Sequence, residues 1–278
     1  MSLRMMAALL MLVMPLSSAQ AIQRNDLPSC YAQAGISEFK QPSSGRLLTV
    51  IIDQTLTMPE DIQRAAWGQI DRFIQPGDQV RLYTFSALIP GQYIRLLFTG
   101  TLDTPIPDKQ RNSVSMNRLR NFDRCMNNQR SLYNKTMGRQ FVSALREASS
   151  QHPRSEIMFA LREIASDVNQ ITPREHVVFL ISDMLEHSDS TSFYARGSMR
   201  NLNINQEIAK ADANKLFAKL DESRIYVTGG GLATDTQRHA NRSGAAMDTL
   251  EEFWRQYFHR SGSVLAGFGK PLLNLELR

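Results

Sequence analysis

The sequence predicts an α/β protein with a doubly wound, mostly parallel central sheet flanked by helices. Three short runs, at 47–52, 176–181 and 224–227, are rich in β-branched residues, as strands buried on both faces of a parallel sheet are. Helical segments separate them, and this alternation is typical of a single doubly wound domain. Of the 278 residues 42% are hydrophobic, which is enough for one sizeable core.

The N-terminus predicts export. Arg4 precedes an apolar run at 5–16, and small residues at 17–21 end in Ala-Gln-Ala, so residues 1–21 have the pattern of a signal peptide cleaved after Ala21. The apolar run is shorter than the roughly 20 residues that span a bilayer, and no later run reaches that length. Few cysteines and no glycosylation-rich stalk favour the bacterial periplasm, and secretion stays open as the alternative.

The predicted mature chain has a lead-in at 22–44, followed by a domain at 45–278. Its two cysteines are Cys30 in the lead-in and Cys125 in an insertion at 99–130. An oxidising compartment favours a disulfide between them, which would staple the lead-in to the insertion. Two free buried thiols are the alternative.

One helix and two strands follow the first strand in the first half of the domain. We expect a helix from Pro59 to Gln75, with its apolar residues on one face, and strands at 80–85 and 93–98 joined by a turn at 89–91. The insertion at 99–130 is the least regular segment. Its basic residues form either a solvated face or a docking surface, and they are Lys109, Arg111, Arg118, Arg120, Arg124 and Arg130.

The second half alternates helices and strands. We expect helices at 131–149, 156–167, 204–220 and 247–259, and strands at 176–181, 224–227 and 263–268. A loop at 186–192 follows the 176–181 strand at the same edge of the sheet. The glycines at 229–231 predict a turn, because no Gly-Lys-Ser/Thr sequence follows them. The net charge of +5 permits an anionic partner, but no motif indicates nucleic acid.

Oxygen-bearing side chains follow the first strand where it ends. Asp53 closes the apolar run, and Thr55 and Thr57 come after it at alternate positions. Ligands of open α/β sheets bind at the carboxyl ends of strands. Alternate residues of a tight loop can aim their oxygens at one point, which suits a hard ion such as Mg2+ or Mn2+. The five histidines show no ligand-like spacing, so zinc is not expected.

Asp-x-Thr-x-Thr after a hydrophobic strand resembles the Asp-x-Ser-x-Ser start of the metal-ion-dependent adhesion site (MIDAS) of von Willebrand factor type A domains. That family adds a Thr before a later helix and an Asp after a later strand, and Ser155 and Asp183 stand at those places. Met184 stands where the family often has Gly. The resemblance implies a metal site of Asp53, Thr55, Thr57, Ser155 and Asp183, with one coordination position open for an acidic residue of a protein partner. It covers nearly all of the domain but is specific only at the site.

Each of these residues also has an ordinary structural interpretation. Thr57 and Glu60 match a capping box, Ser155 matches a helix N-cap, and Asp183 matches a common loop acid. If only these roles applied, the chain would be a metal-free structural subunit of the same fold.

An enzymatic interpretation also stays open. Asp-Gln-Thr-Leu-Thr resembles the Asp-Lys-Thr-Gly-Thr motif of haloacid-dehalogenase-type phosphotransferases, which implies Asp53 as the nucleophile and Asp183 as a Mg2+ ligand. Such chemistry needs a cation ahead of the second acidic motif, normally Lys, and no Lys lies between Lys135 and Asp183. We therefore expect a binding module rather than an enzyme.

Overall fold

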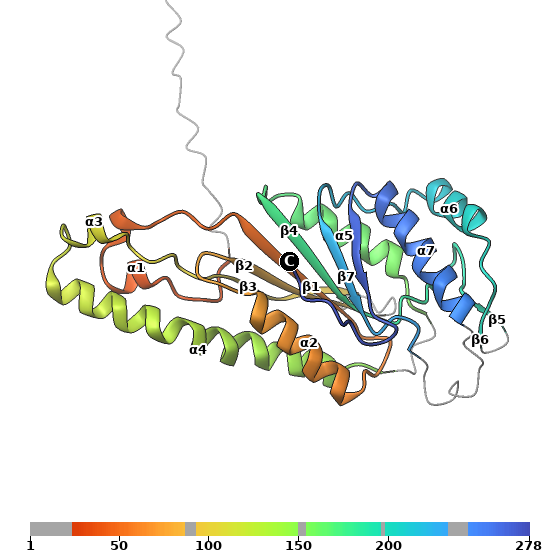
Figure 1. The fold of residues 1–278 in the computed structure, drawn as a ribbon, viewed down its shortest axis with the longest axis horizontal. Helices are drawn as coiled ribbons and strands as arrows, with labels where there is room; N and C mark the ends of the chain where they lie inside the picture. The colour runs from red at the N-terminus through yellow and green to blue at the C-terminus, as the bar shows by residue number, and fades with distance from the viewer. Residues whose placement is uncertain (1–23, 87–92, 150–153, 196–197, 233–243) are drawn as a thin grey trace, which may run out of the picture.

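The computed structural model describes residues 24–86, 93–149, 154–195, 198–232 and 244–278. Its centre is a six-stranded sheet in the order β3-β2-β1-β4-β7-β8 (Figure 1). β3 is antiparallel to β2, and the other neighbouring strands are parallel. The predicted α/β class with a mostly parallel sheet is confirmed. The strands are β1 (Arg46–Asp53), β2 (Gln79–Phe85), β3 (Ile94–Thr101), β4 (Glu175–Ile181), β7 (Arg224–Thr228) and β8 (Val264–Phe268).

β1 is buried on both faces, as its apolar sequence predicts. Leu47 and Ile51 belong to one hydrophobic core, while Leu48, Val50 and Ile52 belong to the other. The alternation follows from the two-residue period of a strand. β1 therefore lies between two cores and between two parallel neighbours, β2 and β4.

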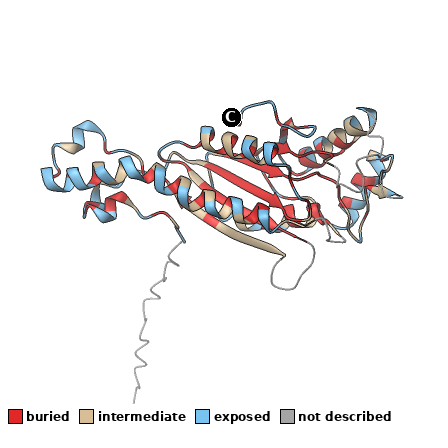
Figure 2. Cartoon of the chain, turned by 90° about the horizontal axis from the view of Figure 1, so that it is seen from below, coloured by how far each residue is buried: buried red, intermediate tan, exposed pale blue. Residues whose placement is uncertain are grey.

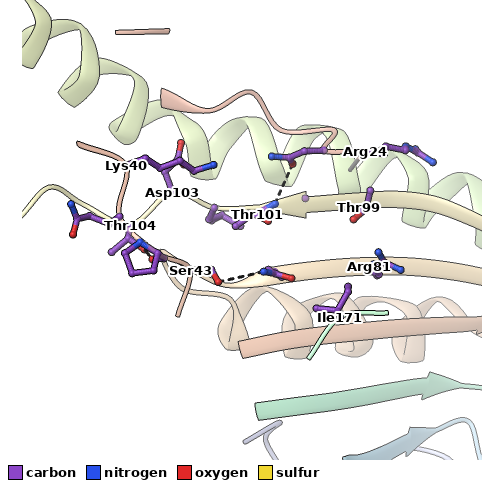
Figure 3. A pocket seen from close by; sticks show the side chains of 15 residues that line it. Arg24, Lys40, Ser43, Arg81, Thr99, Thr101, Asp103, Thr104 and Ile171 are labelled. Atoms are coloured by element: carbon purple, nitrogen blue, oxygen red, sulfur yellow. Dashed lines mark hydrogen bonds between the residues drawn. The ribbon is translucent and has the colours of Figure 1, made fainter. Parts of the chain in front are cut away.

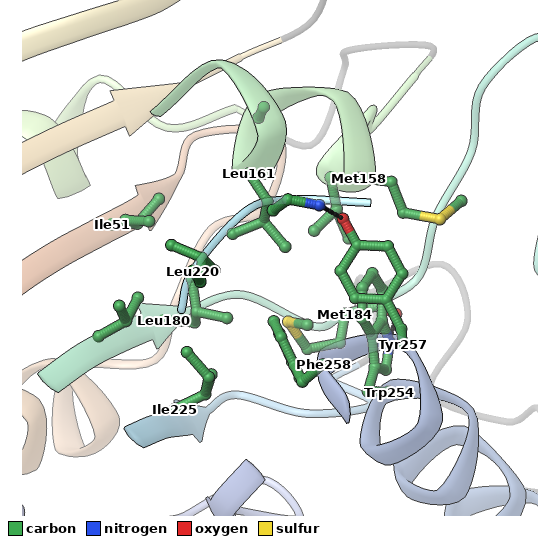
Figure 4. Close-up of a cluster of buried hydrophobic side chains, with 14 of the residues drawn as sticks. Ile51, Met158, Leu161, Leu180, Met184, Leu220, Ile225, Trp254, Tyr257 and Phe258 are labelled. Atoms are coloured by element: carbon green, nitrogen blue, oxygen red, sulfur yellow. Dashed lines mark hydrogen bonds between the residues drawn. The ribbon is translucent and has the colours of Figure 1, made fainter. Parts of the chain in front are cut away.

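Helices cover both faces of the sheet (Figure 1). On one side are α2 (Glu60–Phe73) and α4 (Met116–Arg146), with the C-terminal residues Leu273 and Leu277 in the same core. The other side has α5 (Ile157–Val168), α6 (Ile204–Ala213) and α7 (Gly244–Arg260). Figure 4 shows that second core, where Trp254 and Tyr257 of α7 lie among aliphatic side chains of α5 and the strands.

The predicted strands are confirmed within three residues at each end, but α6 ends earlier than expected. It stops at Ala213 rather than at residue 220, because Lys215 adopts a left-handed φ of 54°. The amide of Leu216 then donates to the carbonyl of Ala211 at 2.9 Å, which closes the helix end.

The prediction of an irregular segment at 99–130 was wrong for the second half of that range. α4 begins at Met116 and continues unbroken to Arg146. It therefore contains most of the helix expected at 131–149, and it extends that helix back through the end of the insertion. A short helix, α3 (Asp108–Arg111), precedes it. Leu119 and Phe122 are buried at three-residue spacing, but the surrounding sequence is so polar that this helical signal was not recognised.

The lead-in packs on the start of α4, as expected. It contains α1 (Cys30–Gln33) and the single-turn helix η1 (Ser37–Phe39). With the residues that flank α3 and the first turns of α4, it forms a small third core around Tyr31 and Phe122. The expected disulfide between Cys30 and Cys125 is present. These elements form an arm that extends beyond the sheet (Figure 1). The predicted signal peptide and the turn at 89–91 lie outside the described residues.

Candidate functional site

The carboxylate of Asp53 is the centre of the candidate site. The residue is 1% exposed and ends β1, the central strand. Its Oδ1 accepts hydrogen bonds from the amide and the hydroxyl of Thr55, at 2.9 and 2.6 Å. Its Oδ2 accepts from the hydroxyls of Ser182, at 2.8 Å, and Ser155, at 3.2 Å. Three hydroxyls from three separate chain segments therefore converge on one buried carboxylate.

Ser155 reaches Asp53 from the segment before α5. Its backbone pairs with His187, with amide-to-carbonyl distances of 3.1 and 2.8 Å, and this fixes the segment against the 186–192 loop. The N-cap of α5 is Glu156, without a side-chain capping bond. The alternative that Ser155 is only an N-cap was therefore wrong, because Ser155 lies one residue before the N-cap and its hydroxyl donates to Asp53.

Thr57 differs from Thr55. It is exposed, and none of the hydrogen bonds to Asp53 comes from it. The capping box with Glu60 was wrong, because Glu60 is the first residue of α2 and a capping box requires the third. The structure therefore brings Thr55 to Asp53 and leaves the side chain of Thr57 exposed.

Asp183 directly follows Ser182, whose hydroxyl donates to Asp53. Its Oδ1 accepts from the amide of Leu185 at 2.9 Å, and its Oδ2 accepts from the hydroxyl of Tyr194 at 3.2 Å. The first contact is an Asx-turn, an ordinary role for a loop acid, so the predicted metal role stays a prediction. Met184 has a left-handed φ of 61°, the conformation that Gly adopts without strain.

Ser182 was not recognised in the sequence. It follows Ile181, which pairs with Ile52, so it lies level with Asp53 on the neighbouring parallel strand. The one signal in the sequence is that Ser182 directly follows the apolar run at 176–181, as Asp53 follows the run at 47–52. Only the register between β1 and β4 shows that the two side chains meet.

Further buried acids lie at this edge of the sheet. Glu186 is fully buried, its Oε2 accepts from the amide of Met158 at 3.0 Å, and its Oε1 has no hydrogen-bond partner among the described residues. Burial raises the pKa of Glu186 to about 7. Burial also raises the pKa of Asp53 above its ordinary value, against the opposing effect of the hydrogen bonds from Thr55, Ser182 and Ser155. The site therefore disfavours negative charge unless a cation compensates it.

The donor set fits a hard cation. Each hydroxyl that donates its hydrogen to Asp53 keeps two lone pairs on its oxygen. Thr55 and Ser155 can therefore coordinate a cation through these lone pairs while they hydrogen-bond to the carboxylate. Oxygen ligands of this kind are those that Mg2+ takes. Among the described residues, no group of three or more His, Cys, Asp or Glu side chains is arranged to bind a metal ion. Any metal held here would therefore rely on hydroxyls beside Asp53.

A separate hollow lies at the opposite edge of the sheet from Asp53, beside the start of β2 and the end of β3. It has a volume of about 650 Å³ and lies between the lead-in and the ends of β2 and β3 (Figure 3). Two of its cations are compensated nearby, since Arg24 pairs with Asp26 and Arg81 pairs with Asp167. None of the predicted site residues lines it, so it is distinct from the Asp53 site.

Comparison with known proteins adds little to this geometry. No family model matches the chain, and no curated protein matches it. A crystal structure of the pilus adhesin SpaC from Lactobacillus rhamnosus GG resembles 78% of the chain at 10% sequence identity, with a TM-score of 0.37. The chain spans 27% of that adhesin, and at this TM-score the likeness carries no argument about function. No helix within the described ranges is long and apolar enough to cross a membrane.

Proposed function

We propose that this chain is an exported binding module of the von Willebrand factor type A class, in which the Asp53 site holds Mg2+ and accepts a carboxylate from a protein partner. The observation that carries the proposal is the convergence of hydroxyls from three segments on Asp53 at the carboxyl end of the central strand. The sheet order, with β1 at the centre and one antiparallel strand beyond β2, supports the class.

The proposed site binds a metal ion and a partner carboxylate, and it catalyses no covalent reaction. Asp53 supplies negative charge, and Thr55 and Ser155 supply neutral oxygens. Asp183 adds a second buried carboxylate, and Thr57 adds an exposed hydroxyl. Mg2+ keeps near-octahedral coordination and retains several waters when few protein ligands reach it. A partner carboxylate that replaces one of these waters would complete the contact.

The test is calorimetric titration of Mg2+ and Mn2+ into the chelator-stripped mature protein. We expect saturable binding that is lost in Asp53→Ala and weakened in Ser155→Ala, which removes a single hydroxyl. Asp189→Asn is the matched control, because it removes an exposed acid at the same edge that pairs with Arg154. Its metal affinity should equal that of the wild type.

Two results would count against this function. A folded protein that binds neither ion at millimolar concentration would indicate a metal-free structural subunit. Mg2+-dependent hydrolysis of a phosphate monoester, abolished by Asp53→Asn, would instead assign the site to phosphoryl transfer.

A further inference from the structure

The outer face of α4 carries a row of basic side chains that we call the α4 stripe. It consists of Arg120, Arg124, Lys135, Arg139 and Arg146, all exposed. At 3.6 residues per turn these positions fall within an arc of about 100° around the helix axis. With a rise of 1.5 Å per residue, the stripe is about 39 Å long. Neither Asp123 nor Glu147, the nearest acids of this segment, falls within that arc.

Positive charge is concentrated on this helix. α4 has seven basic residues and a single acid, Asp123, so it alone carries more net positive charge than the whole chain at +5. Within the described ranges none of the five stripe residues forms an ion pair, whereas Arg130, on another face of the same helix, pairs with Asp71 at 2.7 Å. The part of the chain that the structure describes therefore leaves the charge of the stripe uncompensated by ion pairs.

The stripe points away from the sheet. On the opposite face of α4 the side chains of Tyr133, Met137 and Phe141 are buried in the core against β2 and β3. Figure 2 shows exposed positions recurring along the length of the long helix. Because the inner face is packed, α4 is a rigid support that holds the five cations in one line.

The stripe lacks the features of a stable protein interface. Two exposed aliphatic residues lie within or beside the stripe, Val142 with an exposed fraction of 43% and Leu132 with 37%. No exposed aromatic side chain accompanies them among the described residues. Stable protein interfaces have an apolar core with aromatic anchors, and the arginines that add binding energy there enter pockets of the partner at that core, whereas the arginines of the stripe have no apolar core around them. A long row of evenly spread cations instead matches a surface of repeating anionic groups.

The cellular compartment in which the disulfide forms limits which anionic surfaces the α4 stripe can meet. The disulfide between Cys30 and Cys125 ties the arm to α4 and is typical of oxidising compartments outside the cytoplasm. Phospholipid headgroups line such compartments, and anionic lipids attract juxtaposed Lys and Arg side chains. We propose that the α4 stripe docks the protein on an anionic lipid bilayer, with its guanidinium and ammonium groups against lipid phosphates. This inference does not depend on the Asp53 site.

The experiment is co-sedimentation of the mature, disulfide-bonded protein with lipid vesicles in the presence of a chelator, so that metal binding plays no part. We expect binding to vesicles of phosphatidylcholine with about one-third phosphatidylglycerol, and none to phosphatidylcholine alone. Salt at about 0.5 M should release the protein, because it screens charges beyond a few ångströms. A triple variant, Arg124→Gln, Lys135→Gln and Arg139→Gln, should bind about 100-fold more weakly.

A matched variant separates the stripe from net charge. Lys40→Gln, Arg174→Gln and Lys219→Gln together remove the same charge from exposed positions off the helix that have no ion pair in the described structure. This control should keep most of the affinity. Equal weakening by both triple variants would overturn the proposal, as would failure of the wild type to bind the anionic vesicles. Binding to poly-glutamate without binding to vesicles would also overturn it and assign the stripe to an acidic protein partner.

Discussion

Replacing His176 should change how the stability of the protein depends on pH. His176 is on β4, and its ring nitrogens contact two hydroxyls: Nε2 lies 2.9 Å from Thr49 Oγ1 and Nδ1 lies 2.6 Å from Ser223 Oγ. Burial lowers the pKa of His176 from 6.5 to about 4. The folded protein therefore holds this ring neutral at pH values where the unfolded chain protonates it.

The sign follows from proton binding. Between pH 6.5 and about 4 the unfolded state binds one more proton than the folded state at this residue, so the free energy of unfolding falls as pH falls. A difference of 2.5 pKa units corresponds to about 3 kcal/mol, spread over that interval. Above pH 6.5 the contribution is fully present, and below pH 4 it is fully lost.

The assay is urea unfolding of the wild type and His176→Gln from pH 4 to 8 in chelator. At pH 8 the variant should be less stable by about 1–3 kcal/mol, because it disturbs two buried hydrogen bonds. This deficit should shrink by about 3 kcal/mol, and vanish or reverse, as the pH falls to 4. His259→Gln, at an exposed position near the end of α7, is the control for losing a histidine. A stability difference between wild type and His176→Gln that stays constant across the range would refute the reasoning.

Three further predictions concern buried groups. Glu186→Gln should remove a pH dependence of opposite sign. Because burial raises the pKa of Glu186 from 4.5 to about 7, the wild type should lose up to about 3 kcal/mol of stability as the pH rises through that interval. The variant should not lose this stability, and denaturation of both proteins at pH 4.5 and 8 tests the difference. Tyr133→Phe should raise stability by about 1 kcal/mol in thermal or urea unfolding, since the Tyr133 hydroxyl is buried with no hydrogen-bond partner in the described part of the chain, and a loss of stability would contradict this. Met184→Gly and Met184→Ala both remove a buried side chain, but only Gly adopts the φ of 61° at this position without strain. The Gly variant should therefore be the more stable of the two by about 1 kcal/mol in urea unfolding. Equal stabilities would mean that the backbone is not strained at residue 184.

The strands were predictable because each is a short apolar run that ends in a polar or turn-forming residue. β1 and β4 are buried on both faces, and their sequences show this directly. The disulfide was also predictable, since a chain that is predicted to be exported and has two cysteines has a single possible pair. α4 was only partly predicted, because the few apolar residues of its first half, such as Leu119 and Phe122, stand in a polar sequence and pack only on the small arm core.

The sequence by itself determined the α/β class, the ends of most strands and the position of Asp53 at the end of the central one. These are local properties, set by apolar periodicity and by the residues that stop each element. Tertiary structure decided which oxygens meet. Ser155 and Ser182 are 102 and 129 residues from Asp53, and they reach it because β1 and β4 are parallel neighbours in register and the 186–192 loop holds the segment before α5. Register and loop closure depend on packing between distant segments, and a single sequence does not encode them in any local pattern.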